Sequence, residues 1–416
     1  MSGARTPEGA AELAARLTRP EIAALSPYHV QDAAGLIKLD AMENPFALPQ
    51  AEAAALGAHL AGVALNRYPD GAGTEVIGAL RRRFAIPEGS GVLLGNGSDE
   101  LLLLLMMVFA GPGRGVLVPT PTFSMYRVMA RMTGSAFTEV PLASPSFELD
   151  LPAMLAAIED AQPSVVILAC PNNPTGVEYP AEALHAVIEA APGLVVVDEA
   201  YAPFAARTIL PEIARYPNVL CLRTLSKMGL AGIRLGFLVA DSHLTEALDR
   251  ARLPYNINSL SQATASWLLE HYAVLADQIE TIIAERAALV LALETLEGVR
   301  SWPSGTNFLL LETPLGGDEV AAELRTRGIL IKSMQQADPR LARCIRVTVG
   351  TRSENEALLV ALKEVLRAEP ASAPERADLR SNFVSMLFRA PRRCAGATTP
   401  SPAGSAGDRF GAPRVR

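Results

Sequence analysis

The sequence predicts an α/β fold in which a mainly parallel, seven-stranded sheet is sandwiched by helices. Between about residues 64 and 240, short runs rich in β-branched residues alternate with helical patterns, which is typical of βαβ units. After Pro254 helical patterns dominate and only two strand-like runs occur, so a second, smaller α+β domain is expected there. The 416 residues leave room for both domains.

Seven strands are predicted in the first region, and helices are expected between them, for example at residues 99–109, 124–132 and 181–190. Several strands are continuous apolar runs, as in strands that are covered on both faces. The strands are Val92–Leu94, Val116–Val118, Ala136–Val140, Val165–Ala169, Leu194–Val197, Val219–Leu222 and Leu235–Val239.

The chain is expected to divide into five segments. They are an N-terminal tail (1–19), a segment that packs with the small domain (20–62), the large domain (63–257), the small C-terminal α+β domain (258–368) and a tail rich in Ala, Pro, Ser and Arg (369–416). In the small domain we expect a long helical stretch from Ser261 to about Leu296. The composition of the last segment predicts disorder. Its arginines would suit an anionic surface, but an extension without a binding role is favoured.

Composition narrows the class of partners. A net charge of −7 gives no basic field for nucleic acid. The four cysteines and five histidines are isolated in the sequence, so no metal site is expected and a reduced cytoplasm fits. The most apolar stretch, Leu101–Ala110, is too short to span a membrane. Small molecules and a second copy of the chain are the expected partners.

Lys227 follows the predicted strand Val219–Leu222. A lysine after a strand is commonly a solvated loop residue. Here Thr224 and Ser226 precede it and Arg234 follows it, so the lysine could bond covalently to an aldehyde cofactor whose phosphate the neighbours hold.

Two loops nearer the N-terminus would suit the same cofactor. In residues 95–100, the glycines allow a tight turn and Ser98 suits the start of a helix, whose free N–H groups attract a phosphate. Phe123, in residues 121–126, can stack on a flat ring. Ordinary helices also begin with such turns, and Phe123 would be equally unremarkable as core packing.

Two further loops follow predicted strands. In residues 171–176, Asn173 can donate an amide N–H to a ring oxygen, although the segment also reads as a plain turn. Asp198 ends the buried run Leu194–Val197, where a carboxylate is costly unless it is paired. A protonated pyridine nitrogen would be a suitable partner; a metal ion or a structural hydrogen-bond set are the alternatives.

Taken in order, the segments GNGSDE, PTFSMY, PNNPTG, VVVDEAY and TLSKMGLAGIRLGF resemble the fold-type I pyridoxal-phosphate aminotransferases, the aspartate-aminotransferase-like class. Within that class the chain is similar to the histidinol-phosphate aminotransferase family. The resemblance covers roughly residues 20–368. It implies a transaminase with pyridoxal 5'-phosphate as its cofactor.

The resemblance also implies roles for individual residues. Lys227 would bind the cofactor covalently and move the proton, Asp198 would pair with the pyridine nitrogen, and Asn173 and Tyr201 would hydrogen-bond the ring's phenolic oxygen. Phe123 would cover the ring. The phosphate would be held by Ser98, Asp99, Ser226, Arg234 and, from the other subunit of a homodimer, Tyr68.

The expected substrate-binding residues are Tyr28, Asn44, Lys332 and Arg346. A guanidinium fork such as that of Arg346 suits a carboxylate or a phosphate. Two departures from the family pattern are present. Lys332 stands where many members have a second phosphate-binding arginine, and the loop from Lys227 to Arg234 is one residue shorter than in many aminotransferases.

The expected reaction is reversible amino transfer between L-histidinol phosphate and 2-oxoglutarate in histidine biosynthesis. An aminotransferase for aromatic amino acids is the nearest alternative, because Arg346 would serve a carboxylate directly. A decarboxylase of a phosphorylated amino acid is a further alternative. A non-enzymatic ligand sensor is disfavoured, because no basic helix-turn-helix pattern precedes residue 60.

Overall fold

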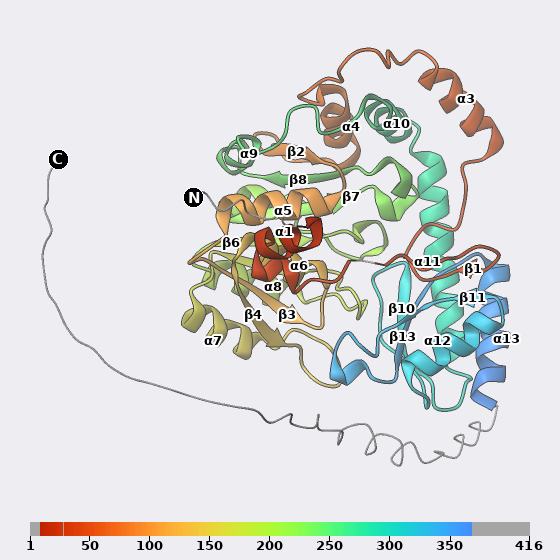
Figure 1. Cartoon of the computed structure of the whole chain (residues 1–416). Helices are drawn as coiled ribbons and strands as arrows, with labels where there is room; N and C mark the ends of the chain where they lie inside the picture. Colours follow the sequence, from red (N-terminus) through yellow and green to blue (C-terminus); the bar gives the residue numbers. More distant parts are fainter. Residues whose placement is uncertain (1–8, 28, 368–416) are drawn as a thin grey trace, which may run out of the picture. The chain divides into compact units, whose positions relative to one another are not determined.

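The computed structural model describes residues 9–27 and 29–367 (Figure 1). Tyr28 and the C-terminal segment 369–416, for which the sequence predicts substrate binding and disorder respectively, lie outside the described residues. No helix in the described part of the chain is long and apolar enough to cross a membrane.

A seven-stranded sheet forms the centre of the large domain, with the strand order β2-β8-β7-β6-β5-β3-β4. All neighbouring strands are parallel except β8, which runs antiparallel to both β2 and β7. The predicted fold class is confirmed. The strands are β2 (Gly91–Gly95), β3 (Gly115–Thr120), β4 (Ala136–Pro141), β5 (Val165–Ala169), β6 (Leu194–Asp198), β7 (Val219–Thr224) and β8 (Gly236–Ala240).

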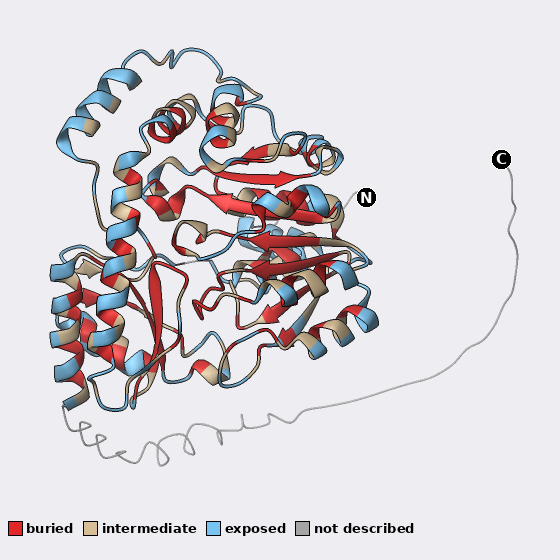
Figure 2. Ribbon diagram, turned by 180° about the vertical axis from the view of Figure 1, so that it is seen from behind, coloured by how far each residue is buried: buried red, intermediate tan, exposed pale blue. Residues whose placement is uncertain are grey.

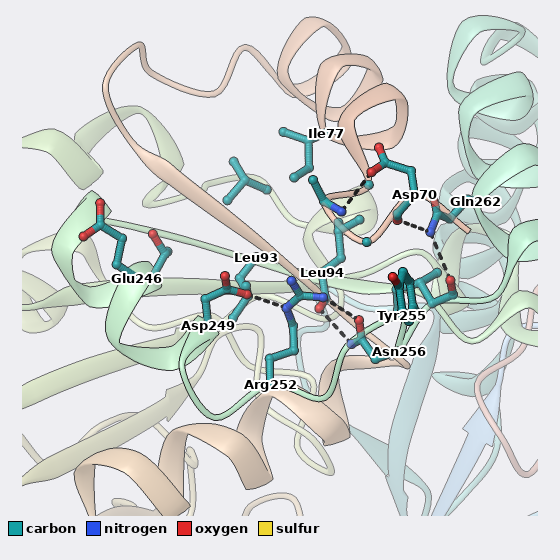
Figure 3. Close-up of a pocket in the computed structure, with 16 residues that line it drawn as sticks. Asp70, Ile77, Leu93, Leu94, Glu246, Asp249, Arg252, Tyr255, Asn256 and Gln262 are labelled. Carbon is teal, nitrogen blue, oxygen red and sulfur yellow. Dashed lines mark hydrogen bonds and ion pairs between the residues drawn. The ribbon is translucent and has the colours of Figure 1, made fainter. Parts of the chain in front are cut away.

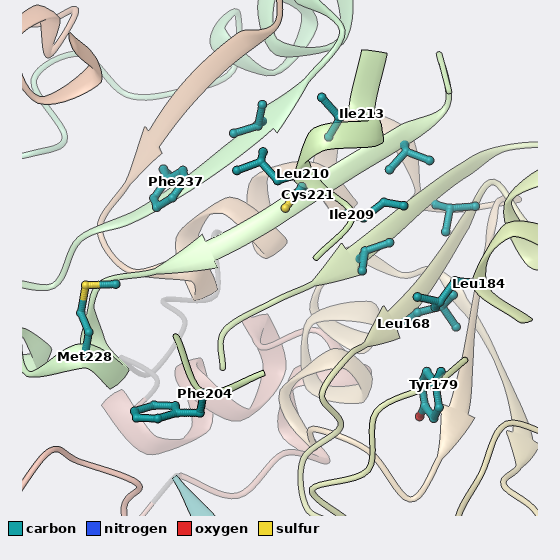
Figure 4. Packing of buried hydrophobic residues seen from close by; sticks show 14 of the residues in the cluster. Leu168, Tyr179, Leu184, Phe204, Ile209, Leu210, Ile213, Cys221, Met228 and Phe237 are labelled. Atoms are coloured by element: carbon teal, nitrogen blue, oxygen red, sulfur yellow. The ribbon is translucent and has the colours of Figure 1, made fainter. Parts of the chain in front are cut away.

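Helices cover both faces of this sheet because alternate side chains of a strand point to opposite faces. On β5, Val165 and Ile167 join the apolar cluster that includes the helices α5 (Ser98–Phe109) and α6 (Met125–Thr133). Val166 and Leu168 join the opposite cluster, with α4, α7 and α8, part of which is drawn in Figure 4. These three helices are Thr74–Phe84, Leu151–Ala161 and Ala181–Ala190. Figure 2 shows the sheet as the buried layer.

The expected helical stretch after Ser261 consists of two helices, α10 (Ser259–Glu270) and α11 (Ala273–Leu293). The break at His271 and Tyr272 lets α10 pack on α4 of the large domain while α11 packs on α13 (Arg352–Arg367). Helical periodicity alone did not reveal this change of direction, because it results from contacts with two different parts of the fold.

The small domain contains a four-stranded antiparallel sheet with the order β12-β13-β10-β9. Helices α11, α12 and α13 pack on it through one apolar cluster. The N-terminal strand β1 pairs with β11 of the same region, in parallel. The remaining bounds here are β1 (Ile37–Lys38), β9 (Arg300–Ser301), β10 (Phe308–Glu312), α12 (Gly317–Thr326), β11 (Ile329–Leu330), β12 (Lys332–Ser333) and β13 (Cys344–Thr348).

Shorter elements complete the described chain. They are the α-helices α1 (Ala10–Leu17), α2 (Pro20–Ala23), α3 (Gln50–Leu60) and α9 (Ser242–Asp249), and the 3-10 helices η1 (Ala202–Phe204), η2 (Leu210–Arg215), η3 (Ser226–Met228), η4 (Ala231–Ile233) and η5 (Pro339–Leu341).

The parallel strands β3, β5, β6 and β7 end at the same edge of the sheet, so the loops that follow them converge. In open α/β sheets this carboxyl edge is where ligands bind. Phe123, Asn173 and Lys227 lie in the segments that follow β3, β5 and β7, and Asp198 is the last residue of β6.

Candidate active site

A cavity of ≈ 240 Å³ lies at this edge. Nine of the predicted cofactor residues line it: Ser98, Asp99, Phe123, Asn173, Asp198, Tyr201, Ser226, Lys227 and Arg234. The fold therefore brings together residues that span more than 130 positions in the sequence. Among the other lining residues, Ala41, Met42 and Glu43 come from the N-terminal segment, and Tyr126 comes from α6.

Lys227 sits in the short 3-10 helix η3, directly after β7. Burial lowers the pKa of its amine to about 8, and the nearby positive charge of Arg346 acts in the same direction. Its Nζ atom donates a long hydrogen bond, of 3.5 Å, to the carbonyl oxygen of Ala41. An amine must be neutral to act as a nucleophile, and the lowered pKa increases the neutral fraction of Lys227 near neutral pH.

Asp198 is the last residue of β6 and is only 5% exposed. Its carboxylate accepts hydrogen bonds from the Tyr126 hydroxyl (2.6 Å) and from the backbone N–H of Ala200 (3.1 Å). Burial raises the pKa of Asp198 to about 6, whereas these two hydrogen bonds lower it. The group is thus a buried carboxylate without a cationic partner among its hydrogen bonds, facing a cavity.

Tyr126 was not among the residues predicted for the site, although it lies in the motif that contains Phe123. Tyr126 is completely buried, and its ring meets that of Phe123 edge-on, with centroids 5.5 Å apart. Burial and the Asp198 carboxylate raise the pKa of the Tyr126 hydroxyl, which therefore remains a donor. A tyrosine three residues after Phe123, at the start of a helix, was the available signal.

Asn173 and Tyr201 lie on the side of the cavity next to the small domain. The Nη1 atom of Arg346, on β13, donates to Oδ1 of Asn173 at 2.6 Å, and its Nη2 atom donates to the carbonyl oxygen of Asp40 at 3.0 Å. Burial raises the pKa of the Tyr201 hydroxyl, while Arg346 opposes that shift. A guanidinium thus reaches the cavity wall without lining the cavity itself.

The opposite end of the cavity suits an anion. The helix α5 begins at Ser98, and its first turn presents backbone N–H groups. Arg234, in a left-handed conformation (φ 51°), lies with its Nη2 atom 3.8 Å from the Asp99 carboxylate. Gly97 has a left-handed backbone (φ 84°), which favours glycine, and a Cβ atom there would lie 2.7 Å from that Nη2 atom, so a larger residue would displace the Arg234 side chain. The short loop thus brings Arg234 to the cavity wall.

The segment of residues 40–44 closes the cavity from the N-terminal side. Met42 has a left-handed backbone (φ 54°). Its N–H donates to Oγ1 of Thr348 (2.9 Å), and its carbonyl oxygen accepts from Nδ2 of Asn307 (2.9 Å). The Nδ2 atom of Asn44 donates to the Met228 carbonyl oxygen at 3.1 Å. These bonds hold the segment against the loop that carries Lys227.

Four of the predicted site residues that the structure describes do not line the cavity: Arg346, Asn44, Lys332 and Tyr68. Asn44 supports its wall, as described above. Lys332 lies on β12 directly opposite Arg346 of β13, so the two side chains share a face of the small sheet. Tyr68 is 81% exposed and stacks on Tyr255, with ring centroids 4.6 Å apart.

A second cavity, of ≈ 200 Å³, lies between β2, α9 and the loop before α10 (Figure 3). Its polar groups bond to one another: Arg252 donates to Asp249 (2.6 Å) and to Asn256 (2.8 Å), and Gln262 donates to the carbonyl oxygen of Asp70 (2.9 Å). It contains neither a lysine nor a buried carboxylate without a partner. In the described residues, no group of three or more His, Cys, Asp and Glu side chains could hold a metal ion.

A mainly parallel sheet whose carboxyl edge presents a lysine of lowered pKa, a buried carboxylate and a helix N-terminus defines an enzyme of the aminotransferase type. The chain belongs to the aminotransferase class I and II family, whose model matches residues 34–362.

Similar proteins and similar solved structures include several aminotransferases. The chain is 47% identical to histidinol-phosphate aminotransferase 2 of Nitrosococcus oceani, over 84% of this chain and 97% of that protein. It is also 47% identical to the histidinol-phosphate aminotransferase of Chromobacterium violaceum, with the same coverage. The structure of histidinol-phosphate aminotransferase from Sinorhizobium meliloti in complex with pyridoxal-5'-phosphate matches with a TM-score of 0.76 and 27% identity, covering 84% of this chain and 98% of that one.

Proposed function

We propose that this protein is a pyridoxal-phosphate-dependent transaminase that transfers an amino group reversibly between L-histidinol phosphate and 2-oxoglutarate, in histidine biosynthesis. The observation that carries the proposal is the convergence of Lys227, Asp198 and the N-terminus of α5 on one cavity. The 47% identity to proteins named histidinol-phosphate aminotransferase supports the choice of substrate. When bound, the cofactor supplies an electron sink for the substrate's α-carbon.

The residues around the cavity fit that cofactor. Asp198 would keep the pyridine nitrogen protonated, since its buried carboxylate faces the cavity and accepts hydrogen bonds from two neutral donors, the Tyr126 hydroxyl and the Ala200 N–H. Asn173 and Tyr201 would donate hydrogen bonds to the phenolic oxygen, and Phe123 would cover a ring face. The phosphate would lie at the α5 end, held by Ser98, the backbone N–H of Asp99, Ser226 and Arg234.

Lys227 would perform the proton transfer. Its amine must be neutral to accept a proton from the substrate's α-carbon, and burial has lowered its pKa to about 8. Substitution of Lys227 by alanine should therefore abolish turnover while leaving the protein folded. Wild-type rates in this variant would disprove the assigned role.

The substrate anion would be bound by the face of the small sheet that carries Arg346 and Lys332. A phosphate ester and a dicarboxylic acid both suit two cations on one face. We place Tyr28 near the substrate on the resemblance alone. Asn44 would act on the substrate side by holding residues 40–44 in place.

Arg346 also favours a second candidate function, the aromatic amino acid aminotransferase, because a guanidinium binds a carboxylate directly. Initial rates separate the candidates. With 2-oxoglutarate as acceptor, kcat/KM for histidinol phosphate should exceed that for phenylalanine by about a hundredfold. Glutamate formation from phenylalanine alone would reject the proposal, and carbon dioxide release from threonine phosphate would indicate the decarboxylase.

We further propose a cytoplasmic homodimer in which Tyr68 reaches the phosphate of the neighbouring subunit. An exposed apolar group supports this: Leu65, Tyr68, Tyr255 and Leu260 surround one hollow, and Tyr68 is 81% exposed. The domain boundaries expected from the sequence, with residues 63–257 binding the cofactor and 258–368 forming the small domain, remain part of the proposal.

A further inference from the structure

Behind the active site lies a buried ion pair that the proposed chemistry does not use. Glu199 and Arg223 are 2% and 8% exposed. Arg223 donates to Oε2 of Glu199 from Nε (3.0 Å) and from Nη2 (2.8 Å). The pair is surrounded by apolar residues, among them Ile209 and Cys221, which are labelled in Figure 4.

The Glu199 carboxylate has a full set of donors. Its Oε1 atom accepts from the backbone N–H of Ile209 (2.6 Å), and Oε2 also accepts from the Thr208 hydroxyl (2.7 Å). The Sγ atom of Cys221 lies 3.4 Å from Oε2. A buried charge pair with this many partners is costly to remove one member at a time, yet such pairs are often no more stabilising than apolar residues of the same volume. Stability alone is therefore a weak reason for its presence.

The position of the pair in the sheet indicates a different role. Side chains alternate along a strand, so Asp198 and Glu199 point to opposite sides, as do Arg223 and Thr224. Asp198 and Thr224 line the active-site cavity. Glu199 and Arg223 face a separate cavity, which Thr224 also borders and Asp198 does not. The backbone N–H of Glu199 donates to the Leu222 carbonyl oxygen (2.8 Å), which continues the β6–β7 pairing to this point.

The ion pair therefore joins the ends of two adjacent strands. The end of β6 carries Asp198, the proposed partner of the pyridine nitrogen. The chain that leaves β7 reaches Lys227 four residues after Arg223. We propose that Glu199 and Arg223 are positioning residues that fix the distance between Asp198 and Lys227, and so the fit of the cofactor between them. This inference rests on the proposed cofactor but not on the identity of the amine donor.

The test uses the holoenzyme and two measurements that do not depend on turnover: the pH titration of the bound cofactor's visible absorbance, and the dissociation constant of the cofactor. Arg223→Lys keeps the charge but loses the two-nitrogen contact, and Glu199→Gln keeps the shape but loses the charge. We expect each to raise the pH midpoint by about 0.5 unit, because Asp198 supports the ring charge less well. The cofactor should bind about tenfold more weakly.

The matched control is Val195→Ala, a cavity-forming change on the same strand, β6, in the same apolar cluster. It should lower Tm and leave the midpoint and the dissociation constant unchanged. The double variant E199L/R223M fills the space without charges and is expected to fold; it should show the same shifts as the single variants.

Two outcomes would overturn the proposal. In the first, Arg223→Lys and Glu199→Gln lower Tm as the control does but leave the titration and the affinity at wild-type values. In the second, the double variant restores both values, which would show that apolar packing fixes the strand ends equally well. An incorrect assignment of the amine donor would change neither measurement, so the two proposals can fail separately.

Discussion

Replacement of Asp198 by asparagine should inactivate the enzyme and, in the cofactor-free protein, remove a loss of stability that the wild type shows as the pH rises from 5 to 8. Burial raises the pKa of Asp198 from 3.8 to about 6. The folded state therefore binds this proton more tightly than the unfolded state does. The stabilisation that results is fully present below pH 3.8 and is lost as the pH rises through about 6.

The magnitude follows from the pKa difference. A shift of about 2 units corresponds to about 3 kcal/mol of unfolding free energy between the two pH limits. Between pH 5 and pH 8, where many proteins remain soluble, the expected loss in the wild type is about 1.4 kcal/mol. Asparagine does not titrate, so the Asp198→Asn variant should lack this loss. Its altered hydrogen bonds with Tyr126 and Ala200 add an offset that does not depend on pH.

Urea unfolding of the cofactor-free proteins at a series of pH values measures the effect. The free-energy difference between Asp198→Asn and wild type should rise in favour of the variant by about 1.4 kcal/mol from pH 5 to pH 8. Asp277→Asn, on the exposed side of α11, controls for the change of side-chain chemistry. A difference that stays constant across this range, or that runs the other way, would refute the argument that desolvation dominates at Asp198.

Three other predictions concern neighbouring groups. Tyr126→Phe removes a buried hydrogen bond to a carboxylate, worth about 1.5 kcal/mol or more, and should weaken cofactor binding about tenfold in a fluorescence titration. The rate at which the cofactor-free enzyme takes up pyridoxal phosphate, followed by absorbance, should rise about tenfold per pH unit and level off above about pH 8, because neutral Lys227 is the nucleophile. If Tyr68 acts across a homodimer interface, mixing Lys227→Ala with Tyr68→Ala subunits should restore about a quarter of the wild-type sites, because about half of the dimers are mixed and each has one intact site. No recovery in rate assays would exclude that arrangement.

Substrate preference offers a further check. Lys332→Arg adds a second guanidinium on the face of Arg346. It should lower KM for histidinol phosphate about three- to tenfold with little change in kcat, because a bidentate contact adds ground-state binding. An unchanged KM in steady-state kinetics would place Lys332 outside the substrate site.

Much of the large domain could be predicted because its signals are local. Each of the seven strands is a short, mostly apolar run bounded by turn residues, and the predicted runs match β2 to β8 to within about two residues at each end. The site residues could be proposed because each lies in a distinctive loop directly after a strand. The carboxyl edge of a parallel sheet then brings those loops together.

Other features depend on contacts between distant segments, and only the tertiary structure decided them. The hydrogen bond between Tyr126 and Asp198 joins residues 72 positions apart. The closing of the cavity by residues 40–44 depends on Thr348 and Asn307 of the small domain. Periodicity and turn signals report only near neighbours, so neither contact leaves a local trace.

The sequence by itself determined the strands of the sheet, the resemblance to pyridoxal-phosphate enzymes and the lysine that would bind the cofactor. The tertiary structure decided the chemistry of that lysine and of its partner. Burial moves the pKa of Lys227 down to about 8 and that of Asp198 up to about 6. Desolvation depends on everything packed around a charge, and that environment exists only once the separate strand ends have come together.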